Sequence, residues 1–114
     1  MIFKPELVEK ILVGEKTETR RKANPDDSQR YRPGRTYAVQ PGRTEKGVAR
    51  IRVLSAEREA LGEITEEGAR REGFEDLSAF FDHWRGLYGN VDPPQEVWVI
   101  RFELVSRGEE GDER

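Results

Sequence analysis

Two segments of the chain alternate between residue types with the period of a β-strand. In residues 47–56, Ala49, Ile51 and Val53 occupy one set of alternate positions, and larger side chains occupy the other. In residues 97–105, one set of alternate positions begins with Val97, Val99 and Arg101, and the other set begins with Trp98, Ile100 and Phe102. Because successive side chains of a strand point to opposite faces of a sheet, both segments predict strands. We therefore expect the chain to be built around a sheet.

Three other segments have the pattern of helices. Residues 5–12 carry apolar side chains at three- and four-residue spacing, and Gly14 follows as a stop signal. Thr65 is a suitable N-cap for a short helix that Gly73 ends. Residues 77–88 carry a helical stripe of apolar and aromatic side chains. We expect that stripe to pack on the sheet.

The remaining segments predict two short strands, at residues 17–21 and 36–40, the second of them antiparallel to the strand at 47–56. At 114 residues the chain fits one domain with a single modest core. We assign residues 1–105 to that domain. Residues 106–114 are polar and lack apolar anchors, which predicts a disordered tail.

Composition excludes several kinds of chemistry. The chain has no cysteine and only one histidine, so we expect no disulfide, no metal site and no cofactor. No apolar run approaches the roughly 20 residues that span a bilayer, and the N-terminus lacks the apolar core of a signal peptide. We therefore expect no membrane partner and a cytoplasmic location. The dense Arg and Glu content resembles that of thermophile proteins.

Charge is divided unevenly along the chain. Residues 16–52 hold eleven Lys and Arg against four Asp and Glu, whereas residues 53–105 hold five against twelve. Cations mixed with tyrosines suit phosphate neutralisation and base stacking. The alternative is that these cations pair with the acidic half in surface networks. The pI near 5.3 argues against a strong polyanion binder and is compatible with a small nucleotide or a short single-stranded RNA.

Residues 14–21, Gly-Glu-Lys-Thr-Glu-Thr-Arg-Arg, place a lysine and a threonine close together. A threonine hydroxyl needs a base to become a nucleophile, and a partly desolvated lysine has a lowered pKa that suits it to that task. In a regular strand Lys16 and Thr19 point to opposite faces, so they can meet only if the chain is still turning at Lys16. Gly14 makes such a bend feasible. The alternative is that the threonines are ordinary β-formers on a solvated strand.

Four segments, 11–21, 33–34, 72–74 and 98–102, follow one another in an order that resembles the ASCH domain family. The resemblance extends over residues 3–105. It implies an α+β fold, a PUA-like small and mostly antiparallel β-barrel with flanking short helices. It also implies a cleft beside the first helix.

The resemblance further implies candidate functions and residues. Members are proposed to bind RNA or nucleotides, some bacterial members hydrolyse the acetyl amide of N(4)-acetylcytidine, and one branch is associated with ribonuclease activity. By motif, the catalytic residues of the amidohydrolase members correspond to Lys16, Thr19 and Glu72. Threonine at position 19, where the signature often has Glu, is typical of that branch. The residues that we expect to contact substrate or RNA are Arg21, Thr17, Arg20, Glu18 and Arg52.

Two functions follow from this pattern. The first is an RNA- or nucleoside-binding domain that hydrolyses the amide of a modified nucleoside such as N(4)-acetylcytidine. The second is a non-catalytic RNA-binding module, or a ribonuclease-type protein, that uses the same basic cleft. For Glu18 two interpretations stay open: a carboxylate in a different pocket, or an ion pair with Arg20 or Arg52. We leave His83 out of the site and assign Trp84 to the core.

Overall fold

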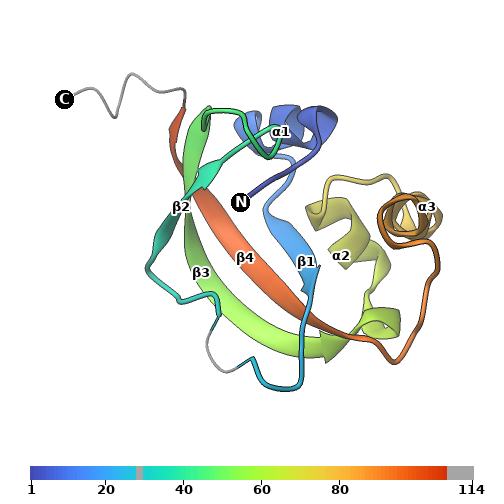
Figure 1. Ribbon diagram of the computed structural model, residues 1–114. Helices are drawn as coiled ribbons and strands as arrows, with labels where there is room; N and C mark the ends of the chain where they lie inside the picture. The colour runs from blue at the N-terminus through green and yellow to red at the C-terminus, as the bar shows by residue number, and fades with distance from the viewer. Residues whose placement is uncertain (28–29, 108–114) are drawn as a thin grey trace.

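The computed structural model describes residues 1–27 and 30–107, and within these residues the fold is α+β (Figure 1). A four-stranded antiparallel sheet carries three α-helices. In chain order the elements are α1 (Pro5–Leu12), β1 (Glu18–Lys22), β2 (Thr36–Val39), β3 (Ala49–Ala60), the short 3-10 helix η1 (Leu61–Glu63), α2 (Glu66–Arg71), α3 (Leu77–Tyr88) and β4 (Glu96–Arg107). Every predicted helix and strand is therefore present.

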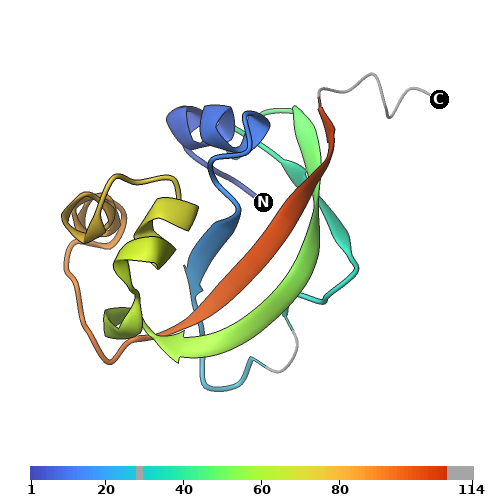
Figure 2. The same ribbon diagram turned by 180° about the vertical axis from the view of Figure 1, so that it is seen from behind.

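The sheet has the order β1-β4-β3-β2, and each neighbouring pair is antiparallel. The long strands β3 and β4 curve together along the back of the molecule (Figures 1 and 2). Their register shifts twice, between Arg50 and Ile51 and between Val53 and Ser55. Such bulges bend a strand and increase its twist, so they help to curl the sheet.

The expected β-barrel does not close. β1 and β2 are the two edges of the sheet, and within the described residues no ladder joins them. The N-terminal segment lies in the space between these edges: Ile2 forms an isolated parallel bridge with Gln40, and Arg21 of β1 donates to the Ile2 carbonyl at 2.9 Å. A barrel needs its edge strands to pair with each other. The occupied gap prevents that pairing, and the sheet stays open.

The helices cover the sheet through separate apolar clusters. Leu7, Val8 and Ile11 of α1 pack with Ile51 of β3 and Phe102 of β4. On α3, the predicted stripe packs against the first half of β4, which confirms that expectation. Within the part of the chain that the structure describes, no helix is long and apolar enough to cross a membrane.

The helix caps follow the sequence closely. The Thr65 hydroxyl accepts from the backbone N–H of Gly68 at 3.0 Å at the start of α2. At the start of α3, Asp76 accepts from the backbone N–H of Ala79 at 2.9 Å. Gly89 ends α3 with a left-handed conformation. The predicted N-cap of α2 is therefore confirmed, and local hydrogen bonds set the start of both helices.

The last strand is longer than the sequence suggested. We expected a disordered tail from residue 106, but Ser106 and Arg107 belong to β4 and pair with Arg50 and Ala49 of β3. Backbone pairing with a neighbouring strand does not require the apolar anchors that these positions lack. The rest of the predicted tail, residues 108–114, lies outside the described residues.

Candidate functional site

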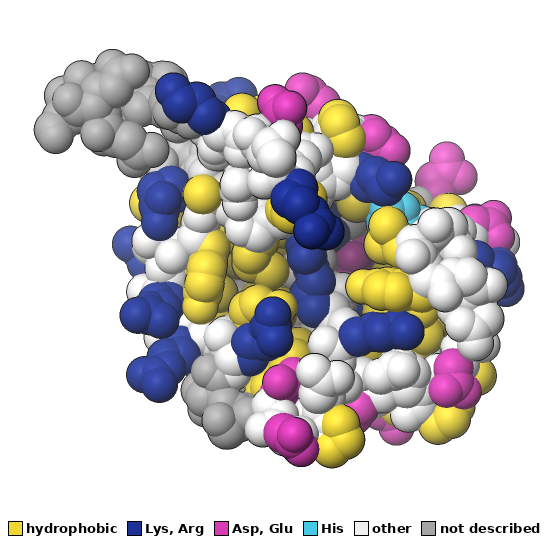
Figure 3. Space-filling model, viewed as in Figure 1, with side chains coloured by type: hydrophobic (Ala, Val, Ile, Leu, Met, Phe, Trp, Pro, Cys, Tyr) yellow, Lys and Arg dark blue, Asp and Glu magenta, His cyan; other side chains and the backbone are white. Residues whose placement is uncertain are grey.

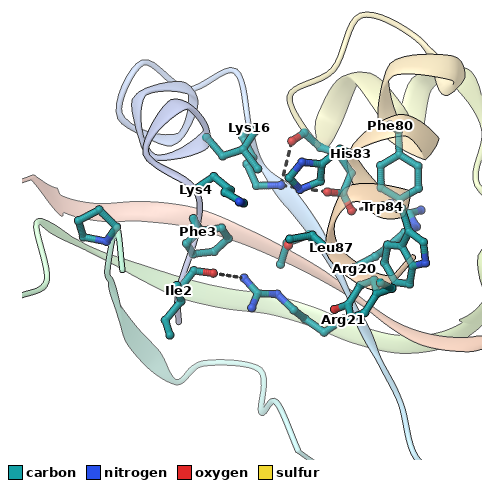
Figure 4. Close-up of a pocket in the computed structure, with 15 residues that line it drawn as sticks. Ile2, Phe3, Lys4, Lys16, Arg20, Arg21, Phe80, His83, Trp84 and Leu87 are labelled. Atoms are coloured by element: carbon teal, nitrogen blue, oxygen red, sulfur yellow. Dashed lines mark hydrogen bonds and ion pairs between the residues drawn. The ribbon is translucent and has the colours of Figure 1, made fainter. Parts of the chain in front are cut away.

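A pocket of about 390 Å³ lies between the N-terminal segment, β1 and α3. Figure 4 shows Lys16, Lys4 and Phe3 on one side of it, and Phe80 and Trp84 of α3 on the other. Five of the eight residues proposed from the sequence line this pocket: Lys16, Thr19, Arg20, Arg21 and Glu72.

Lys16 reaches the pocket because the chain is still turning after α1. Gly14 adopts a φ of +84°, which glycine tolerates, and the backbone N–H of Lys16 donates to the carbonyl of Lys10 at 3.1 Å. β1 begins only at Glu18, so the alternation of a strand does not apply to Lys16. The chain is therefore still turning at Lys16, as the sequence analysis required, and the Lys16 and Thr19 side chains line the same pocket.

The Lys16 side chain is buried and makes three hydrogen bonds. Its Nζ donates to the Glu18 carbonyl at 2.8 Å, to the Glu72 carbonyl at 2.8 Å and to Glu72 Oε1 at 3.0 Å. A neutral amine has two N–H donors and an ammonium has three, so this set of acceptors fits the ammonium. Burial lowers the pKa of Lys16, and the Glu72 carboxylate opposes that shift. Among the described contacts, no Lys16 hydrogen bond reaches Thr19.

Glu72 lies directly after the last turn of α2 and is 4% exposed. Gly73 follows it with a φ of +103°, a conformation that strongly favours glycine. This turn leaves both the carbonyl and the carboxylate of Glu72 within reach of Lys16. The second carboxylate oxygen accepts from Arg20 at 3.3 Å. Glu72 therefore connects α2 to two cations of the pocket.

Glu18 is fully buried in an arginine cluster and does not line the pocket. Its carboxylate accepts from Arg20 at 2.6 Å, from Arg71 at 2.9 Å and from Arg101 at 3.1 Å. Burial alone would raise the pKa of Glu18, but the hydrogen bonds from Arg71 and Arg20 outweigh it and lower the pKa. Of the two interpretations for Glu18, the ion pair with Arg20 is the one that the structure shows.

Thr17 and Arg52 also lie away from the pocket. Thr17 connects elements through its backbone: its N–H donates to the Arg71 carbonyl and its carbonyl accepts from Phe102. The Arg52 side chain is 42% exposed and pairs with Glu103 across β3 and β4 at 3.2 Å. These two residues therefore do not join the group around Lys16.

The family model for the ASCH domain matches residues 1–106. The chain belongs to the ASCH domain family. The expected resemblance is thereby confirmed at the level of the domain. Among curated proteins, no sequence matches this ASCH domain significantly.

Solved structures support the same fold. An ASCH domain from Lactobacillus crispatus superposes with a TM-score of 0.76 at 16% identity, and the match covers 90% of this chain and 72% of that one. A protein from Enterococcus faecalis assigned to the family model DUF984 gives a TM-score of 0.69 at 20% identity, covering 96% of this chain and 72% of that one. At these identities the likeness concerns the fold alone.

The sequence reading missed the wall of the pocket in this ASCH domain that α3 supplies. His83, Trp84, Leu87 and Tyr88 all line the pocket. Burial and the nearby charge of Lys16 lower the pKa of His83, which favours the neutral imidazole. The missed signal was helical spacing, since His83 lies four residues before Leu87 and so shares its face. Trp84 is 2% exposed and belongs to the core as expected, while also bordering the pocket.

Metal binding finds no support in the described ranges 1–27 and 30–107. They contain no cluster of three or more His, Asp or Glu side chains placed to hold an ion. The carboxylates nearest the pocket already accept from cations: Glu72 from Lys16 and Arg20, and Glu18 from three arginines.

Proposed function

We propose that the pocket binds a modified nucleoside and hydrolyses its exocyclic amide, with N(4)-acetylcytidine as the reference substrate. One observation carries this proposal: Lys16 and Thr19 from one segment and Glu72 from another, more than 50 residues away, are all at least 96% buried and line one pocket. The pocket volume of about 390 Å³ lies in the range of small-molecule sites. The rings of His83 and Tyr88 on α3, which are not buried, offer a surface on which a base can stack.

The chemistry begins with a proton transfer. Lys16 has no free lone pair as an ammonium, and Glu72 Oε1 at 3.0 Å is positioned to take its proton. Burial favours the neutral forms of both groups. The Lys16 amine then accepts the Thr19 hydroxyl proton while the Thr19 oxygen bonds to the acyl carbon. As the C–N bond breaks, Lys16 returns that proton to the departing nitrogen. Water then attacks the acyl carbon and gives one proton through Lys16 to the Thr19 oxygen as the C–O bond breaks. The acyl group leaves as a carboxylate, and the second proton passes to solvent.

The test is hydrolysis of N(4)-acetylcytidine, followed by the chromatographic appearance of cytidine. Thr19→Ala, Lys16→Met and Glu72→Gln are each expected to lower turnover by roughly 10²–10⁴-fold, the range for removal of a catalytic acid or base. Thr44→Ala, in an exposed turn, is the matched control and is expected to keep full turnover. Turnover that survives Thr19→Ala, or that requires a divalent metal, would contradict the mechanism.

A second candidate is a non-catalytic RNA-binding module, or a ribonuclease-type protein that uses the same basic cleft. One observation favours it: all three N–H donors of Lys16 are used by Glu18 and Glu72, so Lys16 serves as a structural anchor in the ligand-free protein. Lys and Arg side chains also gather along the β2 side and across the centre of the face in Figure 3. Such cations suit a phosphate backbone.

The two candidates differ in which variant matters. For the binding module, Thr19→Ala should leave the affinity for a short single-stranded RNA unchanged, whereas Arg21→Glu should abolish it. Fluorescence anisotropy measures that affinity, and gel electrophoresis of the recovered RNA distinguishes binding from cleavage. Intact RNA together with no release of cytidine from N(4)-acetylcytidine would favour the binding module over both enzymes.

A further inference from the structure

Arg21 is a partly buried cation without a carboxylate partner among the described residues. Its guanidinium lies 4.8 Å from the centroid of the Phe3 ring and donates to the Ile2 carbonyl at 2.9 Å, as Figure 4 shows. No ion pair includes it. Burial lowers the pKa of Arg21, with smaller opposing contributions from Tyr31, Tyr88 and Glu72.

The neighbouring carboxylates are already committed to other cations. Glu72 accepts from Lys16 through one oxygen and from Arg20 through the other. Glu18 is shared among Arg20 and two further arginines. Consequently no acidic side chain of the cluster is left to pair with Arg21.

The balance of charge in the pocket is positive. Of the four cations that line it, Lys16 and Arg20 pair with carboxylates. The other two, Lys4 and Arg21, are in none of the described ion pairs and supply the excess positive charge. A lowered pKa makes His83, which also lines the pocket, neutral near pH 7. A ligand that carries negative charge would remove this excess.

The donors of Arg21 are open to such a ligand. In the described part of the chain, Arg20 Nε is the one buried side-chain polar atom without a hydrogen-bond partner. The N–H groups that Arg21 does not use for Ile2 are therefore not sealed inside the protein, and Arg21 lines the pocket. The Phe3 ring lies beside this guanidinium, and the planar donor fork of an arginine matches phosphate geometry.

We infer that the ligand of this pocket is a nucleotide and not a neutral nucleoside, with its phosphate held by Arg21 beside Phe3 and Lys4. The inference rests on the proposed function, because a nucleoside site identifies phosphate as the anion that accompanies the base. The base would then face the aromatic side chains of α3 on the opposite wall (Figure 4). Because a hydrogen bond to a charged group is strong, the phosphate should raise the affinity of the nucleotide over that of the nucleoside by roughly tenfold to a hundredfold.

The experiment is isothermal titration calorimetry at constant ionic strength with three probes: cytidine, cytidine 5′-monophosphate and inorganic phosphate. In the wild-type protein we expect the monophosphate to bind about tenfold to a hundredfold more tightly than cytidine. Arg21→Gln should remove that difference and also the binding of inorganic phosphate. Arg85→Gln, an exposed arginine of α3 outside the pocket, is the matched control and should retain both.

Folding of the variant does not decide the result. The comparison of cytidine with its monophosphate uses the wild-type protein alone, and Arg21→Lys offers a second variant that keeps the charge but loses the planar fork. We expect Arg21→Lys to keep only part of the difference. Equal affinities in the wild type, no detectable binding of the monophosphate, or a difference that persists in Arg21→Gln would each overturn the inference.

This result and the proposed hydrolysis can fail separately. Phosphate-dependent binding without turnover would keep the nucleotide as ligand and reject the amidohydrolase. Turnover of N(4)-acetylcytidine without any preference for a phosphate would keep the enzyme and reject the nucleotide. Both measurements use the full chain without added metal.

Discussion

Lys16 and Glu18 are buried ions only two positions apart, and each is compensated by a complete set of partners. Lys16 has three acceptors, and Glu18 has three arginine donors. A buried charge is tolerated in this way, but loss of one member leaves the others uncompensated. The backbone carbonyl of Glu18 also accepts from Lys16. Residue 18 therefore joins the pocket to the arginine cluster without entering the pocket.

At this scale we predict that Glu18→Gln destabilises the protein by about 3–5 kcal/mol, because Arg20, Arg71 and Arg101 lose their common counter-charge. Urea unfolding measures the change. Glu103→Gln is the control, since Glu103 pairs with Arg52 on the exposed side of the sheet and its loss should cost about 0–1 kcal/mol. Equal effects of the two substitutions would show that the arginine cluster does not depend on Glu18.

Among the elements, α3 has two roles that its sequence pattern does not separate. Its stripe identifies a buried helical face, and Phe80 and Trp84 are indeed 1% and 2% exposed. The same face also forms a wall of the pocket with His83 and Tyr88. Helical periodicity reports which side chains face inward. It does not predict whether the space beside that inward face is filled by other side chains or is a pocket.

The N-cap of α3 offers a prediction at the scale of an element. Asp76→Ala removes the acceptor for the backbone N–H of Ala79 and should lower the free energy of unfolding by about 1 kcal/mol. Thermal unfolding followed by circular dichroism measures it. Asp82→Ala is the control, because Asp82 forms only an exposed pair with Arg85 one turn away and should change stability by less than about 0.5 kcal/mol. A cap variant as stable as the control would disprove the role of Asp76.

In the whole molecule, some cations of the basic residues 16–52 form ion pairs with carboxylates of the acidic residues 53–105. Basic Arg20 meets acidic Glu59 and Glu72, and Arg52 meets Glu103. Pairing of the basic half with the acidic half in surface networks is thus confirmed for Arg52 with Glu103, whereas Arg20 pairs with Glu72 inside the protein.

Several cations of the basic half, Arg35, Arg43 and Arg50 among them, have no carboxylate partner in the described ion pairs. Arg21 is the one of these unpaired cations that lines the pocket, where the sheet stays open beside the N-terminal segment.

Stability should fall on acidification in two separate windows. The folded pKa of His83 lies below its ordinary value of 6.5, so below pH 6.5 the unfolded chain binds a proton that the folded protein does not, and unfolding is favoured. The folded pKa of Glu18 lies below 4.5, so its contribution is present above pH 4.5 and is lost as the pH falls through the folded value. His83 contributes to the first window beside the N-terminal amine, whose pKa is also lowered, and Glu18 contributes to the second beside Asp27, whose pKa is lowered as well.

Urea unfolding at a series of pH values tests this order. His83→Gln should flatten the decline just below pH 6.5 and leave the decline below pH 4.5 in place, because the two windows depend on different groups. An unchanged slope below pH 6.5 in the variant would show that His83 does not contribute. The neighbouring charges that act on His83 are Lys16, Lys4 and Glu6.

The helices, the strands, their caps and the ASCH family were readable from the sequence by itself, because periodicity, capping residues and short motifs act over a few neighbouring positions. The tertiary structure decided the rest. It left the sheet open, paired Lys16 with Glu72 across 56 residues, removed Glu18 and Arg52 from the pocket, and left Arg21 without a carboxylate. Which charge meets which, and which buried face borders empty space, depend on residues far apart in the chain, and only packing brings those together.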